Sequence, residues 1–245
     1  MYFLNVSFSD ICEQELLSVV ASPDLKTFQY MVTPNADHLV RLAKDSSFAA
    51  AYDLADYIVC DSKVVYFLSI VFGYKIKQVI TGSDFTKKLI DSSDGGEHGL
   101  SDLIIVGGCE GDIRKLHKEY VNLNIRHYNP PMGFISDEGE VESCIDFLAN
   151  VGSGTVLLCV GSPQQEILAK RIKEDGRFKG FACCVGASID FMVGRASRAP
   201  SILQALGLEW AFRLCMEPRR LWRRYLRACL IILVLSDFLI KQAKR

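Results

Sequence analysis

The sequence lacks the segments that would carry a chain into or across a membrane. Its first residues show no basic stretch followed by a long apolar one, so they predict no signal peptide. The longest apolar run, residues 228–235, is far shorter than the roughly 20 residues that a membrane-spanning helix needs. We therefore expect a cytoplasmic protein that does not cross a membrane by itself.

The signatures of several enzyme classes are also missing. The chain holds no G-x-G-x-x-G dinucleotide fingerprint, no G-x-x-x-x-G-K-[ST] phosphate loop, no G-x-S-x-G elbow and no H-E-x-x-H motif. It has no D-x-D pair, and its four histidines do not show the spacing of metal ligands. These absences argue against oxidoreductases, P-loop proteins, serine hydrolases and metalloenzymes. We predict neither a cofactor nor a metal site.

The nine cysteines do not form a disulfide or zinc pattern. Their number is odd, no C-x-x-C pair occurs, and several, such as Cys60, Cys159 and Cys183, lie inside apolar runs. A free cysteine in such a run behaves as a small buried hydrophobic residue. We expect reduced thiols, as is typical of cytosolic proteins.

What the sequence does have is the composition and alternation of an α/β protein. Its 245 residues are 49% hydrophobic and 23% charged, which is typical of a globular chain with a sizeable core. Short apolar runs alternate with segments of helical periodicity, and this order predicts a doubly wound, mostly parallel, Rossmann-like sheet. The predicted strands are residues 28–33, 57–60, 102–107, 155–161 and 180–186, and the predicted helices are residues 36–53, 62–72, 112–120, 140–150 and 163–174.

Charge is divided unevenly along the chain. Residues 209–245 hold nine Lys and Arg against three Asp and Glu, a net charge of +6, whereas the other residues together carry a net charge of −7. This asymmetry indicates an anionic partner at one end of the molecule. The sequence therefore predicts an α/β catalytic domain over residues 1–205 and an arginine-rich helical appendage over residues 206–245.

The composition of the basic segment indicates which anionic partner it meets. Both tryptophans lie there, and Arg220, Arg223, Arg224 and Arg227 share one face of a predicted helix. Arginine, tryptophan and a short apolar run are typical of a helix that binds an anionic membrane surface. The alternative is a solvated charged helix that packs its apolar side on the body. Nucleic acid is not predicted as a partner, because the body is acidic and no known binding motif occurs.

Polar residues follow the first two predicted strands. Thr33 and Asn35 follow one of them and Asp61 follows the other. Ligands of open parallel sheets bind outside the carboxyl ends of the strands, where these residues would meet. Asp61 is therefore a candidate general base, held beside Thr33 and Asn35. The alternative is that Asp61 caps the following helix, a role that Asp performs well and that the local pattern favours.

Two further clusters follow later strands. Gly107 and Gly108 either form a tight turn or allow a ligand to approach the backbone, with helix N-terminal amides aimed at a phosphate. In the other cluster, Ser162 is expected to cap a helix whose first residue is Pro163. This helix would place Gln165 at the carboxyl ends of the strands, where its amide could form hydrogen bonds to a nucleotide or a sugar.

The order of these motifs resembles that of one family, the WecG/TagA/CpsF glycosyltransferases, over about residues 28 to 227. One departure precedes Thr81, where the family usually has an arginine and this chain has Lys77-Gln78-Val79-Ile80. The motifs that carry the resemblance are Thr33-Pro34-Asn35, Asp61, Thr81-Gly82-Ser83-Asp84, Pro130-Pro131-Met132-Gly133-Phe134, Gly161-Ser162-Pro163-Gln164-Gln165-Glu166, Gly186-Ala187-Ser188-Ile189-Asp190-Phe191, Arg198-Ala199-Pro200 and the tail from Gly207 to Leu226.

The resemblance implies an inverting, metal-independent glycosyltransferase of cell-surface polysaccharide biosynthesis. Such an enzyme moves a sugar from a UDP-sugar to a polyprenyl-diphosphate-linked acceptor at the inner face of the plasma membrane. N-acetylmannosamine, its uronic acid and related hexoses or uronates are compatible sugars, and a homo-oligomer is compatible as well. The rival interpretations are a nucleotide-dependent oxidoreductase or epimerase, disfavoured by the missing fingerprint and the absence of any Y-x-x-x-K pair, and a non-catalytic membrane scaffold.

The same resemblance gives roles to particular residues. Asp61 matches the catalytic base of the family, and the C-terminal arginines match an appendage that contacts the membrane and the lipid diphosphate. The predicted substrate-binding residues are Thr33, Asn35, Gly107, Gly108, Gln165, Glu166, Arg198, Arg213, Arg220 and Arg224.

Overall fold

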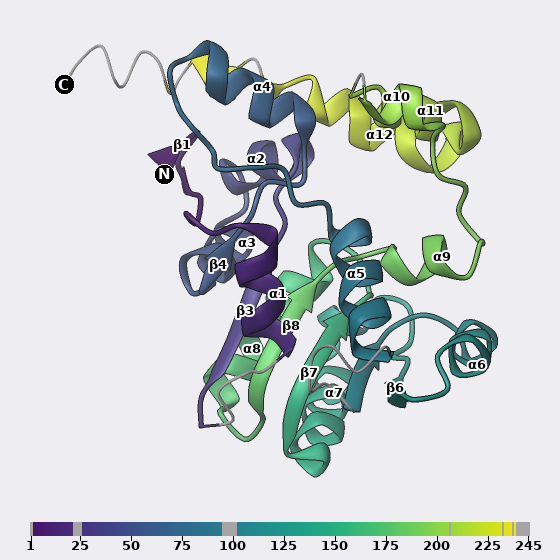
Figure 1. Cartoon of the computed structure of the whole chain (residues 1–245). Coiled ribbons are helices and arrows are strands. Elements are labelled where there is room, and N and C mark those ends of the chain that lie inside the picture. The colour runs from purple at the N-terminus through teal and green to yellow at the C-terminus, as the bar shows by residue number, and fades with distance from the viewer. Residues whose placement is uncertain are drawn as a thin grey trace.

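The structure, a computed structural model, describes residues 2–21, 26–94, 102–205, 207–231, 233–236 and 238. Its centre is a six-stranded parallel sheet with the strand order β4-β3-β8-β7-β5-β6, and helices cover both faces of this sheet (Figure 1). The predicted doubly wound α/β fold is therefore confirmed. The strands of the sheet are β3 (Phe28–Val32), β4 (Tyr57–Ile58), β5 (Asp102–Val106), β6 (Asn124–Tyr128), β7 (Ser153–Leu158) and β8 (Lys179–Cys184), and a separate antiparallel pair consists of β1 (Tyr2–Phe3) and β2 (Val6–Ser7).

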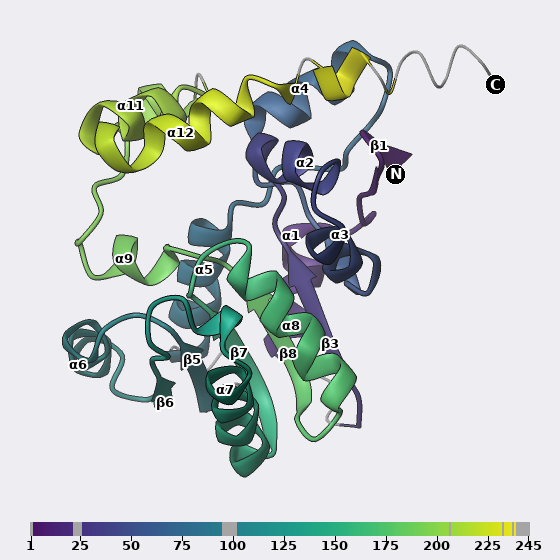
Figure 2. The same cartoon turned by 180° about the vertical axis from the view of Figure 1, so that it is seen from behind.

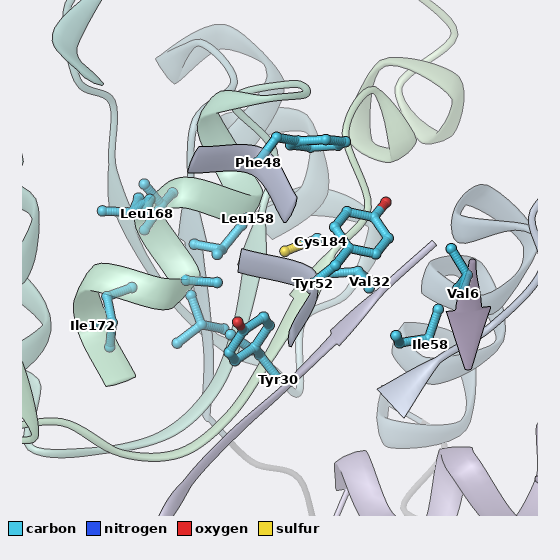
Figure 3. Packing of buried hydrophobic residues seen from close by; sticks show 14 of the residues in the cluster. Val6, Tyr30, Val32, Phe48, Tyr52, Ile58, Leu158, Leu168, Ile172 and Cys184 are labelled. Atoms are coloured by element: carbon cyan, nitrogen blue, oxygen red, sulfur yellow. The ribbon is translucent and has the colours of Figure 1, made fainter. Parts of the chain in front are cut away.

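Each face of the sheet has its own hydrophobic core, because neighbouring residues of a strand point to opposite faces. In β3, Tyr30 and Val32 belong to the first core and Met31 belongs to the second. In the first core, Phe48 and Leu168 come from helices on that face (Figure 3). The first core lies beneath α2 (Ala36–Leu42), α3 (Ser46–Asp53), α7 (Glu138–Val151) and α8 (Gln164–Asp175), and the second beneath α1 (Glu13–Ala21), α5 (Gly82–Asp94) and α6 (Glu110–Glu119).

The segment 36–53, predicted as one helix, forms two. The helix α2 ends at Leu42, and α3 begins after Asp45, whose carboxylate accepts hydrogen bonds from the backbone N–H groups of Ser47 and Phe48, both at 3.1 Å. An Asp in this position satisfies N–H groups that a new helix would leave unpaired. The prediction of a single helix was wrong because apolar periodicity continues through the capped break.

The C-terminal helices lie at the same end of the molecule as α4 (Lys63–Val71), above α2, in both views of the fold (Figures 1 and 2). Two long-range contacts hold them there. Lys63 Nζ donates to the Gln204 carbonyl at 2.6 Å, and Arg227 Nε donates to Asp37 Oδ1 of α2 at 2.6 Å. The basic segment is therefore helical, as predicted, and packs over the carboxyl side of the sheet. Its described helices are α11 (Glu209–Met216) and α12 (Pro218–Ala228), and α9 (Ser188–Met192) and α10 (Ser201–Ala205) precede them.

Two expectations about covalent and membrane features can also be compared with the structure. All nine cysteines are free thiols, and Cys60, Cys144, Cys183 and Cys184 are buried. Burial raises the pKa of the Cys60 thiol to about 12, so this group stays protonated at neutral pH. Within the part of the chain that the structure describes, no helix is both long and apolar enough to cross a membrane.

Candidate active site

The carboxyl ends of β3 and β4 bring three of the predicted site residues together. The Asp61 N–H donates to the Pro34 carbonyl at 3.1 Å, so the segment after β4 lies directly beside the segment after β3. Thr33 is buried at the end of β3, and its hydroxyl donates to the Cys184 carbonyl at the end of β8, at 3.1 Å. Asn35 caps α2, where its Oδ1 accepts from the N–H of Asp37 at 3.0 Å. These contacts make one polar edge of the neighbouring strands β4, β3 and β8.

Asp61 does not cap the helix that follows it. The N-cap of α4 is Ser62, whose Oγ accepts a hydrogen bond from the N–H of Val65 at 3.3 Å. The cap interpretation of Asp61, which the local sequence favoured, is therefore wrong. Ser62 is therefore the residue that caps α4, and the half-buried Asp61 lies just before it at the edge of the sheet.

Gln165 and Glu166 are both buried at the start of α8. Gln165 Oε1 accepts from the Gly186 N–H at 2.8 Å, and Gln165 Nε2 donates to Glu166 Oε1 at 2.9 Å. Gln165 thus fixes the turn after β8, and Glu166 fixes the orientation of the Gln165 amide. The expected cap by Ser162 is wrong: the N-cap of α8 is Pro163 and carries no side-chain cap, so the helix begins one residue later than predicted.

The surroundings of Glu166 favour its neutral form. Burial raises the pKa of this carboxyl, and the Gln165 amide and the charge of Arg41 only partly oppose the effect. Three buried polar atoms of the described residues have no hydrogen-bond partner, and all belong to this region: Glu166 Oε2, Ser162 Oγ and Arg41 Nε. Buried polar atoms without partners are uncommon in proteins. They mark the start of α8 as a place where a polar ligand group or a water molecule would be stabilised.

The raised pKa of Glu166 predicts a pH-dependent stability. A folded state that holds a proton more tightly than the unfolded chain is stabilised by that group at low pH, and this contribution is lost as the pH rises through the folded pKa. Glu166→Gln keeps the acceptor for Gln165 without the titration. We expect its thermal midpoint to match that of the wild type at pH 5 and to exceed it at pH 8. Glu166→Ala should be destabilised at both values by about 2 kcal/mol, because the Gln165 amide loses its acceptor. The prediction would be contradicted if the thermal midpoint of the wild type rose relative to that of Glu166→Gln as the pH increases.

The Gly107-Gly108 turn follows β5, and Gly107 has a packing role there. Its φ is +101°, and a Cβ at this position would lie 2.7 Å from the carbonyl carbon of Cys159, so only glycine fits between the ends of β5 and β7. The sheet order places β7, β8 and β3 between this turn and Asp61. At roughly 4.8 Å per strand, the two are about 19 Å apart across the sheet. The structure does not bring Gly107 and Gly108 together with Asp61.

Two points along this edge have the topology at which open α/β sheets form crevices, because the chain leaves neighbouring strands toward opposite faces. After β3 it runs to α2, whose Leu39 belongs to the first core, and after β8 it runs to α9, whose Ile189 belongs to the second. The same divergence separates β5, followed by α6, from its neighbour β7, followed by α8. Ligands of open α/β sheets bind in such crevices. One crevice adjoins Thr33 and Gly186, and the other adjoins the Gly107-Gly108 turn.

Two of the predicted arginines meet at α9. The guanidinium carbons of Arg198 and Arg213 lie 5.7 and 5.0 Å from the centre of the Phe191 ring. Arg198 also pairs with Asp84 of α5. Burial by itself would raise the pKa of Asp84, but the hydrogen bonds from Thr81 and Arg198 hold it below its ordinary value. Among the described residues, no carboxylate forms an ion pair with Arg213. This cluster therefore leaves positive charge beside the end of β8.

The remaining predicted arginines, Arg220 and Arg224, lie in α12, but their side chains are outside the described part of the chain. Lys77, which stands near the family's usual arginine, pairs with Glu15 at 3.3 Å and Asp10 at 3.9 Å. Both acidic partners belong to the N-terminal part of the chain. Lys77 is thus engaged there, and Arg198 donates to Asp84 of the Thr81–Asp84 motif.

Two cavities lie near this half of the molecule. One of about 420 Å³ adjoins the Thr81–Asp84 motif and is lined by Lys63, Thr81 and Asp84 among others. The other, of about 480 Å³, lies between the β1–β2 pair and the α2–α3 segment, where Leu4, Leu39 and Ile58 line it. Only the smaller cavity touches a motif of the predicted site.

Sequence reasoning missed the role of Asp37. This buried carboxylate, two residues after Asn35, pairs with Arg227 of α12 at 2.6 Å and with Arg41 at 3.7 Å. Asp37 therefore joins the C-terminal helices to the helix that Asn35 caps. No local signal marks this residue, because its partner lies 190 positions away. The contact of the Phe191 ring with two arginines was also not predicted, although Phe191 belongs to the motif that begins at Gly186.

Comparison with known proteins identifies the class to which this fold and site belong. The sequence profile of the "Glycosyl transferase WecG/TagA/CpsF family" matches residues 1–245, so the chain belongs to this family of glycosyltransferases. It is also similar to a protein of Bacillus spizizenii (strain W23) named N-acetylglucosaminyldiphosphoundecaprenol N-acetyl-beta-D-mannosaminyltransferase. The two are 26% identical over 227 residues, which cover 89% of this chain and 84% of the relative. The chain is thus a glycosyltransferase.

Proposed function

We propose that the protein transfers a sugar from a UDP-sugar to a polyprenyl-diphosphate-linked sugar, with inversion at the anomeric carbon. The observation that carries this proposal is the Asp61 carboxylate, which stands at the end of β4, is not used as a helix cap and adjoins the segment after β3. N-acetylmannosamine is the first donor sugar to test, because the Bacillus spizizenii relative is named for it. Its uronic acid and related hexoses or uronates follow.

In this mechanism Asp61 is the general base. It takes the proton of the acceptor hydroxyl, and the oxygen then attacks the anomeric carbon from the side opposite the diphosphate. The bond from that carbon to the diphosphate oxygen breaks, and its electron pair leaves with UDP. A single displacement of this kind inverts the anomeric configuration. The side chains of Thr33 and Asn35 already form hydrogen bonds to backbone groups, so they fix the segment after β3 beside Asp61.

The leaving diphosphate needs positive charge, which the arginines are suited to provide. The sequence has no D-x-D pair to hold a metal ion, and Arg213 lies on Phe191 without a described carboxylate partner. A guanidinium fits phosphate oxygens through paired N–H donors. We assign Arg213 to the diphosphate, with Arg220 and Arg224 as further candidates. Arg198, which already pairs with Asp84, supports the same cluster.

The donor then runs along the carboxyl edge of the sheet. Its sugar lies in the crevice between β3 and β8, and its nucleoside extends toward the crevice between β5 and β7, where Gly107 and Gly108 lie. The distance between the Gly107-Gly108 turn and Asp61 supports this arrangement, because the turn is too far away to contact a diphosphate at the reacting carbon. Gln165 and Glu166 stand between the two crevices, at the start of α8.

The C-terminal helices supply the membrane contact in this proposal. The net charge of +6 over residues 209–245 suits an anionic surface, and the predicted location is the inner face of the plasma membrane. The Arg227–Asp37 contact supports a docked appendage that covers the strand ends while it rests on lipid, and the Lys63–Gln204 bond holds the segment just before it. The division at residue 205/206 and a homo-oligomer remain predictions.

A donor screen tests the proposal. The purified protein is incubated with a short-chain lipid-diphosphate acceptor and a panel of UDP-sugars, and the products are analysed by mass spectrometry. We expect one donor to give a glycosylated acceptor and UDP, and transfer should persist in EDTA. Loss of transfer in EDTA with recovery on adding Mg²⁺ or Mn²⁺ would contradict the metal-free mechanism. Binding of nicotinamide dinucleotides would favour the oxidoreductase alternative, and membrane binding without turnover of any donor would favour the scaffold.

A further inference from the structure

The helix α4 exposes an apolar face that the proposed mechanism does not use. Val64, Phe67, Ile70 and Val71 are 40%, 64%, 52% and 57% exposed, and their spacing places them on one side of the helix. Only Val65 and Ser69 of this helix are buried. A nine-residue helix with more large apolar side chains in solvent than in the core is unusual for a soluble surface.

The C-terminal helices also expose large apolar side chains. Of the fifteen exposed large hydrophobic residues in the described part of the chain, eleven belong to α4 or to residues 202–233. In α12, Trp222 and Leu226 are 48% and 63% exposed and lie one turn apart. Because α4 and α12 occupy the same end of the molecule in both views, the exposed apolar residues gather at that end (Figures 1 and 2).

The charges around α4 favour an anionic surface. Residues 62–83 contain Lys63, Lys75 and Lys77 and no Asp or Glu, although the body as a whole is acidic. Lys77 pairs with Glu15 and Asp10, so Lys63 and Lys75 are the lysines that favour an anionic surface. All three lysines are exposed, and Lys63 and Lys75 stand just before and just after the exposed apolar face. Lysines whose stems lie along apolar surface while their amines stay in water are typical of segments at a lipid–water interface.

We propose that α4 is a second membrane-contacting element, which enters the headgroup region of an anionic bilayer together with α12. This inference rests on the proposed membrane association and extends it beyond the basic appendage to a helix of the α/β body. The Asp61 carboxylate lies two residues before α4. Contact of α4 with lipid therefore places the general base near the bilayer surface, where a lipid-linked acceptor presents its sugar.

The alternative occupant of this face is a second copy of the chain. Lys63 and Lys75, which flank the face, argue against it, because a symmetric contact of α4 with itself would bring like charges together. Exposed Trp222, which lies on α12 at the same end of the molecule and next to exposed Arg219 and Arg223, also favours lipid.

Vesicle binding of Phe67→Glu tests the proposal, with Val121→Glu as the matched control. Val121 is 75% exposed and lies just before β6, at the amino end of the strands, so it receives the same change of charge away from α4. Full-length proteins are sedimented with phosphatidylglycerol/phosphatidylethanolamine vesicles without any substrate. We expect Phe67→Glu to weaken binding about tenfold, consistent with the loss of one partly buried aromatic side chain, and Val121→Glu to bind as the wild type does. Equal binding by all three proteins would overturn the proposal.

A second measurement does not depend on the stability of the Glu variant. Phe67→Trp, in a chain that also carries Trp210→Phe and Trp222→Phe, should show a blue-shifted emission with vesicles and quenching by brominated lipid. An emission unchanged by lipid would overturn the proposal. So would a Phe67→Glu protein that keeps vesicle binding but changes from dimer to monomer in lipid-free solution, because α4 would then bind a second copy. Neither readout needs turnover, so a failure of the donor screen leaves this test intact.

Discussion

Asp61→Asn is expected to lower the turnover number by roughly 10²–10⁴-fold, the range by which a positioned general base accelerates a reaction. The amide keeps the shape of the side chain but accepts no proton from the acceptor hydroxyl. The affinity for UDP should stay near that of the wild type, since the base acts on the acceptor. Steady-state kinetics with the short-chain acceptor and a UDP titration measure the two quantities.

The matched control is Ser62→Ala, one residue further on. Ser62 caps α4, so its loss should lower the free energy of unfolding by about 1 kcal/mol while turnover changes little. Asp61→Asn should show the opposite pattern, with a nearly unchanged melting temperature and a large loss of rate. A destabilised Asp61→Asn protein with normal turnover would assign Asp61 a structural role and remove the proposed base.

Removal of the chain from Glu209 onward should release the protein from anionic vesicles and abolish transfer to a lipid-linked acceptor. The deleted segment carries a net charge of +6 and both tryptophans. Each Arg near an anionic surface contributes on the order of 1 kcal/mol, so the loss of binding should be steep. High salt should weaken binding of the intact protein as well, because ions screen exposed charges. Co-sedimentation with vesicles and product analysis measure the two effects.

Single arginine variants in detergent distinguish recruitment from chemistry. Arg213→Ala, Arg220→Ala and Arg224→Ala are the candidates for a loss of turnover there, because membrane binding no longer limits the reaction. Arg219→Ala and Arg223→Ala are the controls, since both side chains are exposed on α12 and should matter only for vesicles. Full activity of every variant and of the truncated chain in detergent would mean that the appendage is only an anchor. The melting curve of the truncated chain is needed too, because Asp37 loses Arg227.

The central sheet could be predicted because its strands are apolar runs that end at polar or glycine residues. All five predicted strands are present, although the strand expected at 57–60 is regular only over Tyr57–Ile58. The strand β6 was missed because Asn124, Arg126 and His127 give it no apolar run. It lies at the edge of the sheet, where one side has no neighbouring strand to bury it.

The site was predictable in outline but not in its pairings. Parallel topology by itself places Thr33, Asn35 and Asp61 at one edge, and the structure has them there. Which of two adjacent polar residues caps a helix depends on backbone geometry, and this decided between Asp61 and Ser62. The pairing of Asp37 with Arg227 joins distant parts of the sequence, and no local pattern encodes it. The roles of the individual site residues remain predictions until the variants are measured.

The pairing of β3 with β8 also governs how the protein can fold while it is being made. The Thr33–Cys184 hydrogen bond joins residues 151 positions apart, and the Arg227–Asp37 contact joins residues 190 positions apart. At a synthesis rate of about 5–20 residues per second, β3 waits on the order of ten seconds for its central neighbour. Until then one edge of this apolar strand has no β-partner and can pair with another nascent chain. The edge that carries Asp61 is therefore completed late, and the docked C-terminal helix closes over it last of all.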